Sequence, residues 1–240
     1  MSSTPATALT PSPPVTTGRS ARSPKKDARG PAVPEAARPL PELVLVHGLL
    51  MNRAAMWPLA MRLRAAGFKV HLFGYGTLFT PLAKNADLLA NFVQQRCSEK
   101  AVLLGHSLGG LVCTQALRQH PKLRVTDLVL LGCPFQGAAA ARVLRRVPGI
   151  GRWLGRPLHD WAVNANLATP AVRVRTLAGT KPQGVGRVLC DFQEPNDGTV
   201  TVAETWVEGA FARQELAVSH MGMLLSPEVA AQVLRWTLTC

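Results

Sequence analysis

The sequence predicts an α/β fold in which a mostly parallel sheet of about six strands is flanked by helices. Two observations indicate it. Short apolar runs, many of them rich in Val and Leu, alternate with longer segments whose apolar residues recur every three or four positions. In addition, polar and glycine-containing motifs follow directly after several of the apolar runs. This placement is typical of parallel sheets, which carry their chemistry at the carboxyl ends of the strands.

Six segments are expected to be strands. The run Leu43-Val44-Leu45-Val46 is apolar throughout, which is typical of a strand buried on both faces. The other expected strands are short extended segments at residues 70–73, 101–104, 127–131, 172–178 and 215–218.

Helices are expected between these strands, at residues 54–66, 82–97, 108–120 and 227–238. Gly67 and Pro121 follow two of these segments and are residues that end helices, whereas Pro227 suits the first position of the last one. Strands that alternate with helices form βαβ units, so the sheet should be parallel with helices on both faces.

Composition divides the 240 residues near position 40. Residues 1–40 are rich in Pro, Ser, Thr and Ala and contain no aromatic residue, so we expect a disordered basic tail. Residues 41–240 are expected to form one domain, and the chain is large enough to bury a substantial core. No apolar run approaches the roughly 18 residues of a membrane-spanning helix, and no secretory signal pattern is visible, so we expect a cytoplasmic location.

The net charge of +13 raises the question of nucleic-acid binding. Residues 1–40 carry six Lys and Arg against two acidic residues, which is +4 and leaves +9 for the rest. No recognition motif accompanies this charge, so no nucleic-acid partner is expected. The five cysteines show no metal-binding spacing, and Cys113 and Cys133 stand in apolar stretches, which favours free thiols in the core and a reducing compartment.

The segment Gly105-His106-Ser107-Leu108-Gly109 matches the G-x-S-x-G pattern between an expected strand and an expected helix. The sharp turn at the serine crowds the residues two positions away, so both must be very small. Ser107 is therefore the candidate nucleophile. The helix that follows would aim the backbone amide of Leu108 at a developing oxyanion.

A second oxyanion donor is expected after the first strand, at His47-Gly48-Leu49. Gly48 would permit a tight turn that aims the backbone amide of Leu49 inward. His47 stands at the end of the strand, so we expect it to be a packed, hydrogen-bonded histidine and not a catalytic base.

The candidate acid is Asp197, in the turn Asn196-Asp197-Gly198 after the fifth expected strand. An Asp in such a turn often hydrogen-bonds its own backbone, but this one follows Ser107 and precedes the C-terminal histidine, in the order that a hydrolase triad requires. The alternatives are Asp191, Glu194, Glu204 and Asp160.

The candidate base is His220, on the loop after the last expected strand. It would accept the proton of the serine hydroxyl and return it later, so it must titrate near working pH. The remaining histidines are placed less well: His71 in a strand, His106 in the serine turn, His120 at a helix end and His159 between the fourth and fifth strands.

With these four motifs, the chain resembles the α/β-hydrolase family in its short bacterial-type lipase and esterase branch, from about Leu43 to Trp236. The resemblance implies hydrolysis of small carboxylic esters through an acyl-enzyme intermediate, without metal or cofactor. The family's sheet often begins with antiparallel strands, which have no room before Leu43, so a trimmed core is expected. A thioesterase or acyltransferase stays open, as does a non-enzymatic protein that binds lipid or an acidic partner.

A long segment at about residues 135–171 separates the fourth and fifth strands. Its apolar residues recur every three or four positions among five arginines, so we expect a basic helical lid. It could be a cap with a solvated charged face, a mobile lid that lines an acyl pocket, or a surface that makes peripheral contact with lipid.

Overall fold

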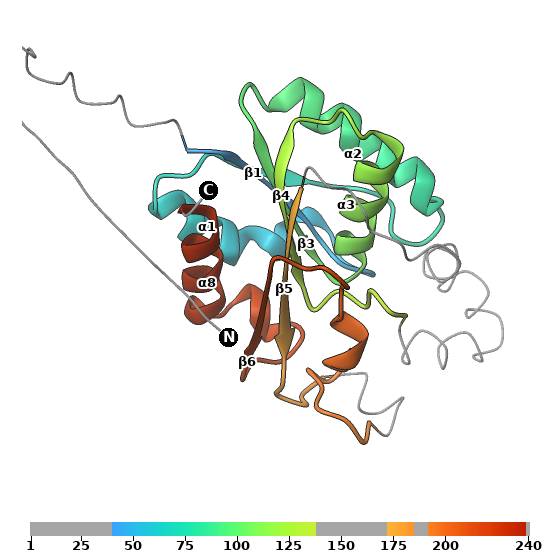
Figure 1. The fold of residues 1–240 in the computed structure, drawn as a ribbon, viewed down its shortest axis with the longest axis vertical. Coiled ribbons are helices and arrows are strands. Elements are labelled where there is room, and N and C mark those ends of the chain that lie inside the picture. The colour runs from blue at the N-terminus through green and yellow to red at the C-terminus, as the bar shows by residue number, and fades with distance from the viewer. Residues whose placement is uncertain (1–39, 138–171, 185–191, 239–240) are drawn as a thin grey trace, which may run out of the picture. The chain divides into compact units, whose positions relative to one another are not determined.

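In the computed structural model, six strands pair into one sheet in the order β2-β1-β3-β4-β5-β6 (Figure 1). All five pairings are parallel. The strands are β1 (Glu42–Val46), β2 (Val70–Phe73), β3 (Ala101–His106), β4 (Val125–Leu131), β5 (Arg173–Gly179) and β6 (Ala212–Leu216). The expected α/β architecture with a parallel sheet is therefore confirmed.

The structure describes residues 40–137, 172–184 and 192–238. All of them belong to a unit that spans Pro39–Cys240. The predicted tail at 1–40 lies almost wholly outside the described residues, as does the predicted lid at about 135–171, so both stay predictions.

Helices cover both faces of the sheet (Figure 1). The helices α2 (Leu82–Arg96) and α3 (Leu108–Gln119) cover one face, and α1 (Trp57–Ala65) and α8 (Pro227–Leu238) cover the other. Successive residues of β1 enter the two cores in turn, because side chains alternate along a strand. No helix among the described residues is long and apolar enough to cross a membrane. Cys113 and Cys133 are buried and free, as the sequence predicts.

Most observed strands and helices begin and end within two residues of the sequence prediction, but two elements differ more. The expected helix at 54–66 begins as a 3-10 turn, η1 (Arg53–Met56), in which the Asn52 side chain accepts from the amide of Ala54. The last strand lies at 212–216 and not at 215–218. It is an edge strand with alternating half-buried and exposed residues. Its sequence is therefore polar and lacks the apolar run that indicates a buried strand. The strand ends at Leu216, where the amide of Val218 folds back to donate to the Leu216 carbonyl at 2.8 Å.

Candidate active site

Ser107 directly follows β3 and directly precedes α3. Its backbone adopts φ 53° and ψ −125°, an uncommon conformation for a residue with a side chain. Such strain clusters at functional sites, where the surrounding structure must hold it. The amide of Ser107 donates to the carbonyl of Leu131 at 2.9 Å, so the turn is anchored to the end of β4.

Close backbone contacts explain why glycines flank this turn. A Cβ atom at Gly105 would lie 2.4 Å from the Cα atom of Gly110. A Cβ atom at Gly109 would lie 2.3 Å from the carbonyl oxygen of Val46, at the end of β1. Backbone atoms cannot move aside cheaply, so these positions exclude any larger residue and permit the sharp turn that presents Ser107.

Asp197 and His220 form a buried hydrogen-bonded pair. The imidazole Nδ1 of His220 lies 2.7 Å from Oδ2 of Asp197 and donates its proton to it. The other carboxylate oxygen, Oδ1, accepts from the amides of Thr199 and Val200 at 2.9 and 2.8 Å. One carboxylate oxygen therefore accepts from the amides of its own turn, and the other accepts from the imidazole of His220.

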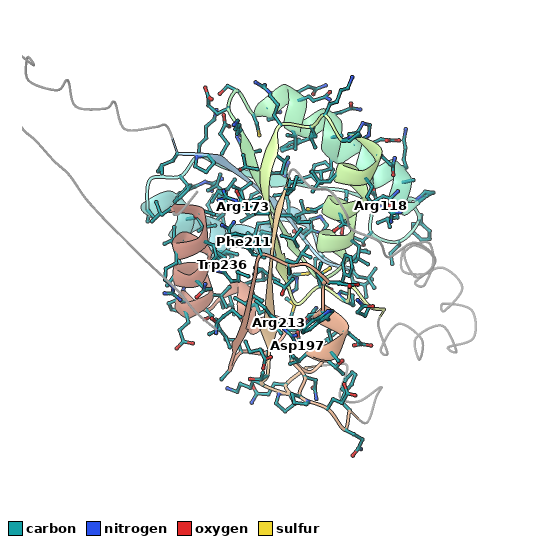
Figure 2. The ribbon with its side chains drawn as sticks, viewed as in Figure 1. Arg118, Arg173, Asp197, Phe211, Arg213 and Trp236 are labelled. Atoms are coloured by element: carbon teal, nitrogen blue, oxygen red, sulfur yellow. The ribbon has the colours of Figure 1, made fainter. Side chains whose placement is uncertain are left out.

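Two glycines at strand ends make room for this pair. A Cβ atom at Gly132, which follows β4 with φ +53°, would lie 3.0 Å from Oδ2 of Asp197 and 3.1 Å from Nδ1 of His220. A Cβ atom at Gly179, the last residue of β5, would lie 2.8 Å from Cβ of Asp197. The side chains of this end of the sheet appear in Figure 2, where Asp197 lies at the opposite end of β5 from Arg173. The pair therefore lies at the carboxyl ends of β4 and β5, and β4 is the strand that also anchors Ser107.

His106 connects the serine turn to the loop that carries His220. It is fully buried, and its Nε2 donates to the backbone carbonyl of His220 at 2.9 Å. The centroids of the two imidazole rings are 4.6 Å apart. Burial, and then the proximity of His220, lower the pKa of His106 to about 3, so its ring is neutral at ordinary pH. Sequence reasoning placed His106 in the motif but missed this contact, which no local pattern signals.

The predicted oxyanion loop passes beside the nucleophile. A Cβ atom at Gly48 would lie 3.1 Å from Cβ of Ser107. The next residue but one, Leu50, has φ 57°, and its amide donates to the hydroxyl of Thr77 at 3.3 Å. Leu49 therefore stands between Gly48, which is packed against the nucleophile, and Leu50, whose amide is already bonded. Thr77 is a further residue that the sequence did not reveal.

Two more features define this end of the sheet. The hydroxyl of Tyr75 donates to the carbonyl of His47 at 2.8 Å, and the two rings stack with centroids 4.5 Å apart. His47 is buried, and its Nδ1 donates to the carbonyl of Gly48 at 3.0 Å, so it is a packed and hydrogen-bonded residue as expected. Leu108 is the first residue of α3, where backbone amides have no acceptor within the helix.

The alternatives to Asp197 and His220 are accounted for in part. Glu194 is exposed, and the carboxylate of Glu204 accepts from the amide of Thr201 at 3.0 Å. His71 pairs with Glu42, and His120 with Asp87. Three further alternatives, Asp160, His159 and Asp191, lie outside the described residues. The choice of Asp197 over Asp191 therefore stays a prediction, supported by the contact with His220.

Residues 43–235 match the alpha/beta hydrolase family. This chain belongs to that family. The match covers all six strands and the helices on both faces, so the family and the observed fold agree.

Among the curated relatives are several proteins named pimeloyl-[acyl-carrier protein] methyl ester esterase. The protein from Klebsiella pneumoniae is 39% identical over 195 residues, which are 80% of this chain and 63% of that protein. The protein from Vibrio campbellii is 40% identical over 102 residues, which are 41% of this chain and 39% of that protein. The chain thus spans less than two thirds of the length of either relative.

Solved structures share the fold at low sequence identity. A Bacillus licheniformis lipase, BlEst2 in its mature form, has a TM-score of 0.71 and 19% identity over 82% of this chain and 92% of that chain. The metagenomic carboxyl esterase MGS0156 has a TM-score of 0.65 and 19% identity over 88% of this chain and 81% of that chain. At this identity the likeness shows a common fold.

Proposed function

We propose that this chain hydrolyses carboxylic esters through an acyl-enzyme intermediate, with Ser107 as nucleophile, His220 as base and Asp197 as the acid that orients the base. The hydrogen bond between Asp197 and His220 at the strand ends beside the Ser107 turn is the observation that carries the proposal. Binding alone does not require these three residue types in this order.

The hydrogen bond between Asp197 and His220 determines which role each imidazole nitrogen has in the proposed reaction. Nδ1 of His220 donates to Asp197, so Nε2 carries the lone pair that accepts a proton. In the first half of the reaction, Nε2 takes the proton of the Ser107 hydroxyl while its oxygen attacks the ester carbonyl. The same proton then passes to the leaving alcohol as the acyl-enzyme forms. Water repeats both steps on the acyl-enzyme, which releases the acid and restores Ser107.

The tetrahedral intermediate places negative charge on the former carbonyl oxygen. We propose that the backbone amides of Leu49 and Leu108 donate to it. Leu108 contributes the free amide of a helix N-terminus, and Leu49 follows Gly48, which packs against Ser107. Loss of one donor of this kind costs about 100-fold to 1000-fold in turnover in other enzymes. The carboxylate of Asp197 stabilises the imidazolium that forms at the same moment.

Methyl esters of acyl chains are the substrate class that we propose to test first, because the curated relatives are named as methyl ester esterases. A thioester or an acceptor alcohol could replace one partner in the same chemistry. These alternatives predict different products: a free thiol in the first case, and a new ester instead of a free acid in the second. Product analysis with one acyl chain on oxygen and on sulfur separates them.

Hydrolysis of a short p-nitrophenyl ester by Ser107→Ala tests the proposal. The variant should lose several orders of magnitude in kcat, because the nucleophile is gone while the fold is kept. Ser226→Ala is the matched control: its hydroxyl accepts from the amides of Glu228 and Val229 at the start of α8, so it should lose stability but keep its turnover. Near-wild-type turnover by Ser107→Ala would reject the assignment of the nucleophile. A wild-type chain without measurable turnover would instead favour the non-enzymatic binding protein.

A further inference from the structure

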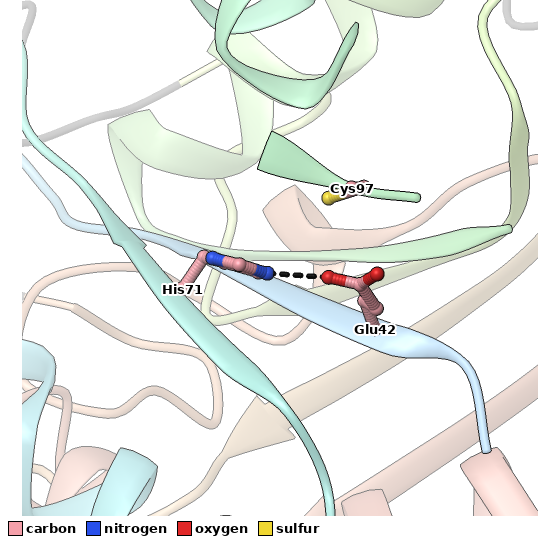
Figure 3. A group of neighbouring side chains, drawn as sticks. All are labelled: Glu42, His71 and Cys97. Carbon is pink, nitrogen blue, oxygen red and sulfur yellow. Dashed lines mark hydrogen bonds and ion pairs between the residues drawn. The ribbon is translucent and has the colours of Figure 1, made fainter. Parts of the chain in front are cut away.

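A second group of polar side chains, shown in Figure 3, lies near the amino ends of β1 and β2, whereas the candidate active site lies at the carboxyl ends of the strands. Glu42 begins β1, His71 lies in β2, and Cys97 follows the last residue of α2. One potential ligand atom from each residue lies within 4.8 Å of the others. Glu42 and Cys97 are buried, and His71 is mostly buried.

We propose that Glu42, His71 and Cys97 form a zinc site that stabilises the fold. A carboxylate oxygen, an imidazole nitrogen and a thiolate sulfur are the three donor types that Zn²⁺ takes in proteins. The mixture of a soft sulfur with nitrogen and oxygen disfavours Mg²⁺ and Ca²⁺, which prefer oxygen ligands alone. Three protein ligands leave the fourth tetrahedral position for a water molecule.

Small side-chain movements convert the observed arrangement into a tetrahedral one. With zinc bonds of about 2.0–2.3 Å, neighbouring ligand atoms are roughly 3.3–3.7 Å apart. The longest separation in the cluster, at most 4.8 Å, must therefore close by about 1 Å. The separation between Nε2 of His71 and Oε2 of Glu42, now 2.6 Å, must open by about as much. Rotations about side-chain bonds supply displacements of this size.

The groups that now face Oε2 of Glu42 can give way to an ion. Lys69 Nζ lies 3.1 Å from this oxygen, but its side chain is 59% exposed and can move into water at small cost. His71 would bind zinc through the Nε2 lone pair and keep its proton on Nδ1. Cys97 would bind as a thiolate, and its proton would be released to solvent. The two anionic ligands then balance the charge of the ion, so nearby cations would not be repelled.

Neighbouring residues hold the Glu42 carboxylate in place, and a cavity lies beside Cys97. Oε1 of Glu42 accepts from the amide and the hydroxyl of Ser98 at 2.9 and 2.8 Å, which fixes the carboxylate and directs Oε2 at the cluster. Cys97 also lines a cavity of about 250 Å³ together with Val93, Glu99 and Lys122. The cavity thus reaches the cluster from the Cys97 side, whereas Glu42 and His71 do not line it.

The cluster of Glu42, His71 and Cys97 lies at a distance from the candidate active site. Glu42 is the first residue of β1, and the predicted oxyanion loop starts after Val46. Four strand steps of about 3.3 Å put roughly 13 Å between them. Zinc at this site should therefore change stability and leave ester hydrolysis unaltered, so the proposal stands or falls independently of the proposed function.

Titration of the full chain with Co²⁺, a spectroscopic substitute for Zn²⁺, tests the site. We expect one ion per chain, with a thiolate-to-cobalt absorption band in the near ultraviolet that disappears when Zn²⁺ is added. Zinc at a hundredfold excess over its Kd should raise the Tm by roughly 5–10 °C. If the wild-type chain shows no thiolate band and no rise in Tm, the three residues form only a hydrogen-bonded cluster and the proposal is wrong.

Two variants assign the signal to this cluster. Cys97→Ala and His71→Leu should each lose the band and the zinc-dependent rise in Tm, with folding checked by circular dichroism. Cys113→Ala is the matched control, because Cys113 is also a buried free thiol but lies in α3, so it should keep both. Retention of the band by Cys97→Ala would place the ion elsewhere and overturn the proposal. An unfolded variant would be replaced by Cys97→Ser in the same assay, with the same two outcomes.

Discussion

Asp197 and His220 are joined at two points. The imidazole Nδ1 donates to Oδ2 of Asp197 over 2.7 Å, and the backbone amide of His220 donates to the carbonyl of Asp197 over 2.8 Å. The second bond fixes the loop that carries the histidine, and the first fixes its ring. Because Oδ1 of Asp197 is held by two amides of its own turn, the carboxylate cannot rotate without breaking both contacts. The pair is therefore preorganised before any substrate binds.

Asp197→Asn should lower kcat about 10⁴-fold and change KM little, because the imidazolium that the carboxylate stabilises forms only during the reaction. Steady-state kinetics on a p-nitrophenyl ester measure both constants. Asp191→Asn is the matched control and should keep most of its turnover. The opposite result, with Asp191→Asn inactive and Asp197→Asn active, would show that the acid is assigned to the wrong residue.

The lowered pKa of His106 predicts how stability depends on pH. The buried ring stays neutral down to a pKa of about 3, whereas in the unfolded chain it takes a proton near pH 6.5. Below pH 6.5 the unfolded state therefore binds more protons, so stability falls as pH falls through the window from 6.5 to 3, by up to about 1.4 kcal/mol per pH unit.

Denaturant unfolding of wild type and His106→Gln between pH 7 and pH 4 checks this dependence. The glutamine keeps a side-chain amide that can donate to the His220 carbonyl but does not titrate. Its free energy of unfolding should therefore fall less steeply than that of wild type as the pH is lowered. If the free energy of unfolding fell equally steeply with pH in both proteins, His106 would not be the group that controls stability at low pH.

Gly132→Ala should damage turnover more than it damages folding. The new Cβ atom would press on both Oδ2 of Asp197 and Nδ1 of His220, at about 3 Å from each, and displace the pair. We expect kcat to fall at least tenfold, since small misplacements of catalytic groups are costly. Gly209→Ala is the matched control: Gly209 also has a positive φ, of +71°, but a Cβ atom there has no neighbour within 4 Å. Equal effects of both variants on kcat would show that backbone strain alone is responsible.

Asp127→Ala should destabilise the fold by about 3–5 kcal/mol, because it leaves the guanidinium of Arg175 buried without its partner. Both side chains are almost wholly buried between β4 and β5. The control is Asp87→Ala, which removes the surface pair with His120 and should cost no more than about 1 kcal/mol. Denaturant unfolding monitored by circular dichroism compares the two, and similar losses would contradict the expected role of burial.

The sequence predicted those parts of the fold that local patterns encode. Apolar runs marked β1, β3 and β4, which lie inside the sheet and are almost completely buried, and the Ser107 turn was placed because it needs small residues at fixed spacing. The edge strand β6 was misplaced, since one side of an edge strand meets solvent and its sequence is polar. The other edge strand, β2, is also only partly buried but keeps three apolar residues out of four, so its sequence still predicted it.

Other features of the candidate site depend on contacts between distant segments. The bond from His106 to the His220 carbonyl joins residues that are 114 positions apart. The space that Gly132 leaves for Asp197 and His220 appears only when β4 and the later loops are brought together. The position of Thr77 against Leu50 likewise follows from packing and not from any motif. Such contacts are set by tertiary structure, so a single sequence cannot reveal them.

Labelling with a fluorophosphonate probe tests the central claim most directly, because the probe reacts only with a serine that a neighbouring base activates. Intact-mass spectrometry should show one adduct per wild-type chain, and peptide mapping should place it on Ser107. Ser107→Ala should show no adduct, and His220→Ala should label far more slowly. A wild-type chain that stays unlabelled, or an adduct on another serine, would contradict the account.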